Sequence, residues 1–190
     1  MIPPTGPLTL ATLGTSLTLN GGWQAPLRLA LESCSGRSIS VLNFGGGGMA
    51  SDWGVLQLPA LIAANPNIVL IEFSINDAYT PYGITLAQSS AQLSVLVDLL
   101  RNNNIFPVLM TMNQTHGDVA QWRPRLADYY ETCRHVGLAT KAPLIDNANV
   151  WASYSPEALA AAIPDGVHPT PEAVSAVLVP LAVQALCPLI

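Results

Sequence analysis

The stretch "NIVLIEFSINDA" (residues 67–78) decides the fold. Its first seven residues are a short run that is apolar almost throughout, bounded by a proline before it and by polar residues after it. Such a run is typical of a β-strand that is covered on both faces, as the strands of parallel sheets are. We therefore expect a buried strand here, with Asn76 and Asp77 just beyond its carboxyl end.

Four other short apolar runs are expected to form strands, and each is separated from the next by a segment of helical period. The expected strands are "LTLATL" (8–13), "SISVLNF" (38–44), "NIVLIEF" (67–73), "IFPVLMTM" (105–112) and "APLID" (142–146). The expected helices lie near 22–33, 51–64, 85–103, 119–136 and 171–186. Strands that alternate with helices pair in parallel through right-handed crossovers. We therefore expect an α/β fold with a five-stranded parallel sheet in a three-layer α/β/α sandwich, and a single domain over 1–190.

Composition excludes several classes of protein. Half of the 190 residues are hydrophobic, a tenth are charged, and the formal net charge is -5. This balance favours a packed globular protein and argues against a nucleic-acid partner, which needs a basic surface. We see no uninterrupted apolar stretch of about 18 residues and expect no membrane span. The N-terminus lacks the positive region of a signal peptide, which favours a cytoplasmic location and leaves secretion open.

The three cysteines Cys34, Cys133 and Cys187 are far apart in the sequence. No C-x-x-C pair occurs, so a structural zinc site is not expected. We expect all three to be small buried side chains, and one disulfide in an exported protein is the alternative.

The loop after the first strand, "GTSLT" (14–18), carries the first candidate for chemistry. In an open parallel sheet, ligands bind at the carboxyl ends of the strands. Ser16 lies at such a strand-to-helix turn, where a hydroxyl is exposed beside free backbone N–H groups. Two other interpretations stay open. Ser16 or Thr18 is a helix N-cap, or the turn holds a phosphate as in flavodoxin-like proteins.

The next two loops offer donors for a negative charge. Four consecutive glycines (45–48) follow the second strand, and such a run permits positive φ or a close backbone approach. One of their N–H groups is a candidate donor to a developing oxyanion. The Asn76 side chain is a second candidate donor, while Asp77 is expected to cap the next turn. A flexible loop and an ordinary turn are the alternatives.

The segment "DGVHPT" (165–170) supplies the group that a serine nucleophile needs. A serine hydroxyl is a weak nucleophile until a base within hydrogen-bond reach removes its proton. His168 is the candidate base, and Asp165 is placed to accept from its other ring nitrogen. The alternative is a turn in which Asp165 is a cap and His168 an ordinary loop residue. His116 and His135 are weaker candidates, because no partner motif accompanies them.

Four blocks in chain order, G-T-S-L-T, N-F-G-G-G-G, S-I-N-D and D-G-V-H-P, resemble the SGNH (GDSL-type) serine hydrolases. The resemblance runs from the first strand to the last helix. It implies that Ser16 is the nucleophile and that Asp165 and His168 complete the catalytic triad. It implies an oxyanion hole made of the Ser16 and Gly48 N–H groups and the Asn76 side chain. It also implies a flavodoxin-like fold and chemistry that uses no metal and no organic cofactor.

Two residues depart from the family's pattern. Thr15 stands where the family has an aspartate, and Ser74 stands where the family has a glycine. Because that aspartate is not a triad member, we expect Ser16 to remain competent. The Thr15 departure keeps a non-catalytic, glycan-binding relative open as an alternative.

Together these features predict a serine ester hydrolase that works through an acyl-enzyme. Short loops without an inserted lid favour short-chain acyl esters, including O-acetyl groups on carbohydrates, as the small-molecule or carbohydrate partner. Trp53, Tyr79, Tyr82 and Trp122 lie in or near the loops and are a candidate stacking surface. The alternative from another class is a flavodoxin-like protein that binds a phosphate or flavin. The sequence does not predict the oligomeric state.

Overall fold

The computed structural model describes residues 2–3 and 5–190, and its strands form one parallel sheet in the order β2-β1-β3-β4-β5. The strands are β1 (Leu8–Gly14), β2 (Ile39–Gly45), β3 (Ile68–Glu72), β4 (Phe106–Thr111) and β5 (Leu144–Asp146). This order is that of flavodoxin-like sheets. The expected α/β fold with a five-stranded parallel sheet is confirmed. Residues 1 and 4, at the start of the predicted 1–190 domain, lie outside the described residues.

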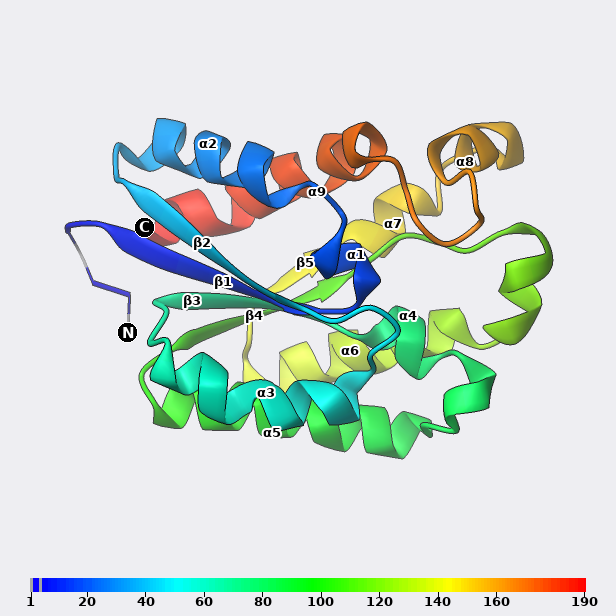
Figure 1. The fold of residues 1–190 in the computed structure, drawn as a ribbon, viewed down its shortest axis with the longest axis horizontal. Helices are drawn as coiled ribbons and strands as arrows, with labels where there is room; N and C mark the ends of the chain where they lie inside the picture. The colour runs from blue at the N-terminus through cyan, green and yellow to red at the C-terminus, as the bar shows by residue number, and fades with distance from the viewer. Residues whose placement is uncertain (1, 4) are drawn as a thin grey trace.

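Helices cover both faces of the sheet. The α-helices are α1 (Ser16–Leu19), α2 (Gln24–Ser35), α3 (Ser51–Ala63), α4 (Ser74–Asp77), α5 (Leu86–Asn102), α6 (Leu126–Thr140), α7 (Asn147–Trp151), α8 (Pro156–Ala162) and α9 (Pro171–Leu186). Short 3₁₀ helices are η1 (Thr80–Tyr82), η2 (Gly117–Trp122) and η3 (Cys187–Leu189). Figure 1 shows α2, α7 and α9 on one side of the sheet and α3, α5 and α6 on the other. The result is the three-layer sandwich.

The central strand β3 shows why its first four residues, Ile68 to Ile71, are all apolar. Successive side chains of a strand point to opposite faces. Ile68 and Leu70 belong to the core under α2 and α9, whereas Val69 and Ile71 belong to the core under α3 and α5. All five residues of β3 are buried. Both faces of the strand therefore require apolar side chains.

The predicted helix over 119–136 is wrong at its start. The chain forms η2, breaks, and begins α6 only at Leu126. Pro124 explains the break, because the residue before a proline is disfavoured in the α conformation. Arg123 accordingly has φ -132° and ψ 49°. The break leaves Arg123 at the carboxyl edge of the sheet instead of inside a helix.

The last helix is as predicted in its bounds, and it corrects the expectation about apolar stretches. The run Pro171–Leu189 is long and apolar enough to cross a membrane by length and composition, with a mean hydropathy of 1.7. Core helices of globular domains meet the same criterion. Here Val174, Leu178 and Ala182 pack into the hydrophobic core. The helix α9 therefore belongs to the helical layer that covers one face of the sheet together with α2 and α7 (Figure 1).

The cysteine expectation is confirmed for one residue and wrong for two. Cys133 is a buried free thiol. Cys34 of α2 and Cys187 of η3 form a disulfide across 153 positions of sequence, with their Cα atoms 6.2 Å apart. The bond ties the second helix to the carboxyl-terminal end of the chain. Sequence spacing does not reveal such a pair, because only packing of α2 against α9 brings the two residues together.

Candidate active site

The candidate site lies at the carboxyl edge of the sheet, where α1 and α4 follow β1 and β3 (Figure 1). Thr15 is the N-cap of α1, and its side chain accepts a hydrogen bond from the Leu17 N–H at 3.2 Å. Ser16 is the first helical residue and is partly exposed. The N-cap alternative thus applies to Thr15, and the Ser16 hydroxyl is free for another partner.

The turn that holds Ser16 is anchored on a buried carboxylate. Glu72, at the end of β3, accepts hydrogen bonds from the Thr15 N–H at 2.6 Å, the Thr15 hydroxyl at 2.9 Å and the Thr18 hydroxyl at 2.7 Å. Gly14 is required beside it, because a Cβ at that position would collide with the Glu72 carboxylate. Thr15, in place of the family's aspartate, is therefore part of the support beneath Ser16.

The hydrogen bonds to Glu72 use hydroxyls that the phosphate-binding alternative would need. Thr15 and Thr18 are fully buried and direct their hydroxyls at Glu72. Burial raises the pKa of Glu72 to about 7, although the hydrogen bonds from Thr18 and Thr15 act in the opposite direction. Two of the three hydroxyls of the turn are therefore committed to an internal acceptor, which leaves Ser16 alone to face the solvent.

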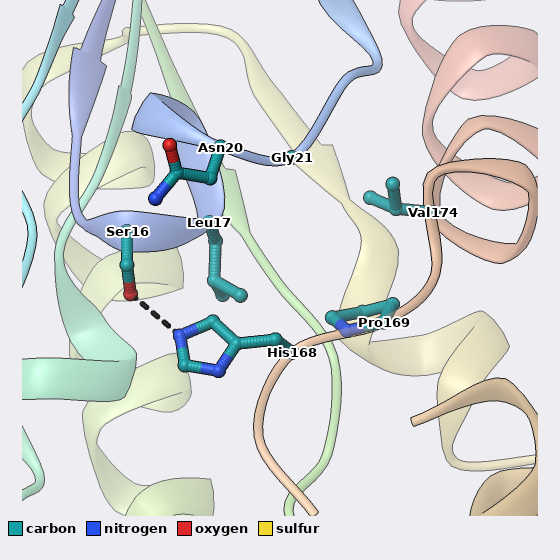
Figure 2. Close-up of a pocket in the computed structure, with 7 residues that line it drawn as sticks. All are labelled: Ser16, Leu17, Asn20, Gly21, His168, Pro169 and Val174. Carbon is teal, nitrogen blue, oxygen red and sulfur yellow. Dashed lines mark hydrogen bonds between the residues drawn. The ribbon is translucent and has the colours of Figure 1, made fainter. Parts of the chain in front are cut away.

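Ser16, His168 and Asp165 form one hydrogen-bonded chain. The Ser16 Oγ lies 2.8 Å from His168 Nε2, and His168 Nδ1 lies 2.7 Å from Asp165 Oδ2. Figure 2 shows the first of these bonds, between α1 and the loop that precedes α9. This is the order in which a base and its orienting carboxylate act on a serine. The structure brings together all three residues that the sequence predicts for the triad.

The loop that carries Asp165 and His168 is held at both ends. Asp165 Oδ1 accepts from the N–H groups of Val167 at 2.9 Å and His168 at 2.6 Å. Burial alone would raise the pKa of Asp165, but these hydrogen bonds and the His168 side chain bring it below its ordinary value. The carboxylate therefore stays charged. The Asn113 amide donates to the Val167 carbonyl at 2.8 Å, and His116 Nε2 lies 2.7 Å from the Ile163 carbonyl.

The predicted oxyanion donors converge on the same cleft as Ser16 and His168. An open cleft of about 500 Å³ is lined by Ser16, Gly48, Asn76 and His168 among others. In the described part of the chain, neither the Ser16 N–H nor the Gly48 N–H donates to a protein acceptor. Gly48 has φ +70°, a left-handed conformation that favours glycine. The Asn76 Nδ2 donates to the Met49 carbonyl at 2.8 Å, which uses one of its two hydrogens.

A second, smaller cavity of about 190 Å³ also borders Ser16 and His168 (Figure 2). Its walls are Leu17, Asn20 and Gly21 from the α1 side, and Pro169 and Val174 from the α9 side. The two hollows meet at Ser16 and His168. A planar group bound at Ser16 can therefore extend in two directions.

Aromatic residues form one wall of the larger cleft, as the sequence suggested. Tyr79 makes edge contacts with Tyr82 and Trp122, with ring centroids 4.9 Å and 6.5 Å apart. Tyr82 also donates its hydroxyl to the Gly48 carbonyl at 2.6 Å. Trp53 is outside this wall and packs against Phe73. Three of the four predicted aromatics therefore line the cleft.

Asp77 and Ser74 serve the framework of the site. The Asp77 carboxylate accepts from the Ser51 N–H at 2.9 Å and from the Ser89 hydroxyl at 2.6 Å, so it holds the start of α3. The expectation that it caps its own next turn is wrong. Ser74 is buried, does not line the cleft, and lies beside the Cys133 thiol.

Two contributors escaped the sequence interpretation. Glu72 was visible as the one charged residue inside the apolar run of β3, and Arg123 had no signal in its segment.

His135 lies on the exposed face of α6 against Glu131, away from the site. Among residues 2–3 and 5–190, no group of three or more histidine, cysteine, aspartate or glutamate side chains is arranged to hold a metal ion.

A flavodoxin-like sheet that carries a hydrogen-bonded serine, histidine and aspartate at its carboxyl edge has the architecture of a serine hydrolase. The GDSL-like lipase/acylhydrolase family matches residues 11–175, and this chain belongs to that family. The resemblance to the SGNH (GDSL-type) hydrolases is thereby confirmed, and the protein is a carboxylic ester hydrolase.

Solved structures with the same fold include an acetylxylan esterase and a lipase/acylhydrolase. Axe2, an acetylxylan esterase from Geobacillus stearothermophilus, superimposes with a TM-score of 0.79 at 22% identity, covering 95% of this chain and 94% of that chain. A lipase/acylhydrolase from Enterococcus faecalis gives a TM-score of 0.80 at 21% identity, with 95% and 96% coverage. None of the curated proteins compared with the chain matches it. Nearly the whole of this chain corresponds to nearly the whole of each of these two solved structures.

Proposed function

We propose that the protein is a serine esterase that removes short acyl groups, acetyl above all, from a carbohydrate or small-molecule alcohol by way of an acyl-enzyme. The observation that carries the proposal is the chain from Ser16 Oγ through His168 to Asp165, with contacts of 2.8 and 2.7 Å. This hydrogen-bonded chain ends at a cleft lined by Ser16 and Gly48, whose backbone N–H groups have no acceptor among the residues that the structure describes.

In the first half-reaction, the Ser16 Oγ attacks the ester carbonyl carbon while its proton passes to His168 Nε2. The carbonyl oxygen becomes an oxyanion, which accepts hydrogen bonds from the Ser16 N–H, the Gly48 N–H and the second Asn76 Nδ2 hydrogen. The intermediate collapses and breaks the bond to the alcohol oxygen, which leaves with the proton held by His168. The acyl group remains on Ser16.

In the second half-reaction, water attacks the acyl-enzyme as His168 removes its proton. The new oxyanion uses the same three donors. Its collapse breaks the bond to the Ser16 Oγ, which takes back the proton from His168, and the carboxylic acid is released. Asp165 accepts from His168 Nδ1 throughout, so it holds the ring orientation and stabilises the imidazolium.

The two hollows support a short acyl group and a larger alcohol. The cavity beside Leu17 and Val174 measures about 190 Å³, which suits a few carbon atoms. The open cleft is lined by Tyr79, Tyr82 and Trp122, and aromatic faces of this kind stack on sugar rings. The fold shared with an acetylxylan esterase supports the same choice of alcohol.

The experiment is hydrolysis of p-nitrophenyl acetate, butyrate, octanoate and dodecanoate by the wild type, Ser16→Ala and Asn76→Ala, with fluorophosphonate labelling of the same samples. We expect Ser16→Ala to lose turnover and label together, and Asn76→Ala to lose about 10²–10³ in kcat. Release of acetate from acetylated xylo-oligosaccharides tests the alcohol. Turnover that rises steadily beyond about eight acyl carbons would contradict a small acyl site, since each buried CH₂ contributes about 0.8 kcal/mol in a long apolar channel.

A further inference from the structure

Arg123 is an unexpected cation in the larger cleft. Its Nε donates to the Ile75 carbonyl at 2.8 Å, and its guanidinium carbon lies 4.8 Å from the centroid of the Tyr79 ring. One further guanidinium nitrogen donates to the Asn76 Oδ1 at 3.4 Å. Among the described residues no carboxylate forms an ion pair with Arg123. The side chain is thus held by neutral groups around α4, and its charge faces the amide of Asn76.

The contact decides which end of the Asn76 amide faces which neighbour. Arginine has only donors, so it accommodates an amide oxygen and not an amide nitrogen. The Met49 carbonyl, which lies on the other side at 2.8 Å, accepts only from the amide nitrogen. In the opposite orientation the amide nitrogen would face a cation and the amide oxygen would face a carbonyl oxygen. Both contacts would be repulsive, so these two neighbours select one orientation.

This orientation matters for the reaction. With Oδ1 directed at Arg123, Nδ2 is on the side of Met49 and the glycine loop, where the Gly48 N–H is also found. One Nδ2 hydrogen is bound by Met49 and the other is left for the substrate. A flipped amide would present an oxygen to a developing oxyanion and would raise the barrier that a donor lowers.

We propose that Arg123 is a positioning residue that holds the Asn76 amide with its nitrogen towards the oxyanion. The proposal rests on the proposed function, in which Asn76 is an oxyanion donor. Arg123 acts through Asn76 and not through the substrate. Its removal therefore affects the chemical step more than ground-state binding, and only while Asn76 is present.

A double-mutant cycle tests the proposal with p-nitrophenyl acetate as the substrate. The four proteins are the wild type, Arg123→Met, Asn76→Ala and the double variant. Methionine keeps much of the packing over Tyr79 and removes every donor. Loss of a hydrogen bond to a charged group corresponds to about a 10- to 100-fold fall in kcat, with KM changed by less than about twofold. In the Asn76→Ala background, we expect Arg123→Met to add less than about a twofold further loss.

Two further variants separate positioning from damage to the fold. Arg125→Met removes an arginine two positions away that pairs with Asp128 at the surface, and it is expected to keep the wild-type kcat. Arg123→Lys keeps the charge and a donor, and it is expected to recover part of the kcat that methionine loses. If Arg123→Met does not fold, the lysine variant carries the same cycle, with an intermediate loss that disappears beside Asn76→Ala.

The results of these measurements distinguish failure of the positioning role of Arg123 from failure of the proposed esterase function. An unchanged kcat in Arg123→Met, or a loss that multiplies undiminished with that of Asn76→Ala, overturns the positioning role while leaving the esterase mechanism in place. A loss confined to KM assigns Arg123 to substrate binding and overturns it as well. Full turnover in Asn76→Ala removes Asn76 from the oxyanion hole, and with it the role of Arg123. Full turnover in Ser16→Ala contradicts the proposed function itself.

Discussion

Ser16 and His168 are 152 positions apart in the sequence, yet the Ser16 Oγ lies 2.8 Å from His168 Nε2. The helix α1 and the loop before α9 bring them together at the carboxyl edge of the sheet (Figure 1). The contact joins the first strand-to-helix turn to the last loop of the fold. The contact on which the proposed activity depends is therefore formed only when these two segments pack together.

His168→Ala should lower kcat for p-nitrophenyl acetate by at least about 10²-fold, because the Ser16 hydroxyl loses its proton acceptor. Fluorophosphonate labelling of Ser16 should slow in parallel. His135→Gln is the matched control, since His135 is exposed on α6 and pairs with Glu131, away from the cleft. Equal losses in the two variants would contradict a specific role for His168.

Asp165→Asn should lower kcat by about 10²–10⁴-fold, because a neutral amide does not stabilise the imidazolium formed on His168. The loop should stay folded, since an amide oxygen can still accept from the Val167 N–H. Rates measured from pH 4 to 9 report the loss of catalysis, and thermal melts of the same variant report any loss of folding. In the wild type the lowered pKa of Asp165 keeps the carboxylate ionised at acidic pH. A variant that turns over at the wild-type rate would remove Asp165 from the triad.

Glu72→Gln should change how stability depends on pH. The pKa of Glu72 is raised from 4.5 to about 7 in the folded protein, so the unfolded chain releases this proton first as the pH rises. The contribution of Glu72 to stability is fully present below about pH 4.5 and is lost as the pH rises to about 7. Urea unfolding of both proteins measures it. The difference in unfolding free energy, wild type minus variant, should fall across this window, and parallel pH profiles would contradict the assignment.

Gly48→Ala should lower kcat by about tenfold. A left-handed backbone costs a residue with a Cβ about 1–2 kcal/mol, so the loop is expected to shift and move the N–H of residue 48 away from the oxyanion. The new Cβ would also lie 3.3 Å from the Tyr82 hydroxyl, which itself bonds to the Gly48 carbonyl. Gly47→Ala is the control, because its Cβ would meet only Leu19 at 3.8 Å. A similar kcat in both variants would show that the Gly48 N–H does not face the reacting oxygen.

Replacing Cys34 and Cys187 together with serine should lower the unfolding free energy by about 2–5 kcal/mol, because the bond closes a loop of 153 positions. Dithiothreitol should lower the Tm of the wild type and leave that of the double variant unchanged.

Because such bonds persist in oxidising compartments, we propose an oxidising compartment in place of the expected cytoplasmic one. Alkylation of the protein from its native source should then find one free thiol, Cys133, and three free thiols would contradict the proposal.

Local pattern was sufficient for the architecture and for the order of the site blocks. The apolar runs of β3 and of the other strands predicted the parallel sheet, because a strand that is covered on both faces needs apolar side chains on both faces. Ser16, Asn76 and Asp165 with His168 were recognisable because each follows a strand or precedes a helix at a fixed place in the chain. The predicted helix start at 119 was wrong, because Pro124 disfavours the α conformation at Arg123 and α6 begins only at Leu126.

By itself, the sequence determined the layers of this protein, the edge at which its candidate site lies, and the residues that we propose to carry the chemistry. Only the tertiary structure decided that Arg123 meets Asn76, that Glu72 supports the turn beneath Ser16, and that Cys34 bonds to Cys187. The reason is physical. Strand and helix patterns arise from neighbours in the chain, whereas these three contacts join segments separated by 47, 57 and 153 positions and form only after the sheet and helices have packed.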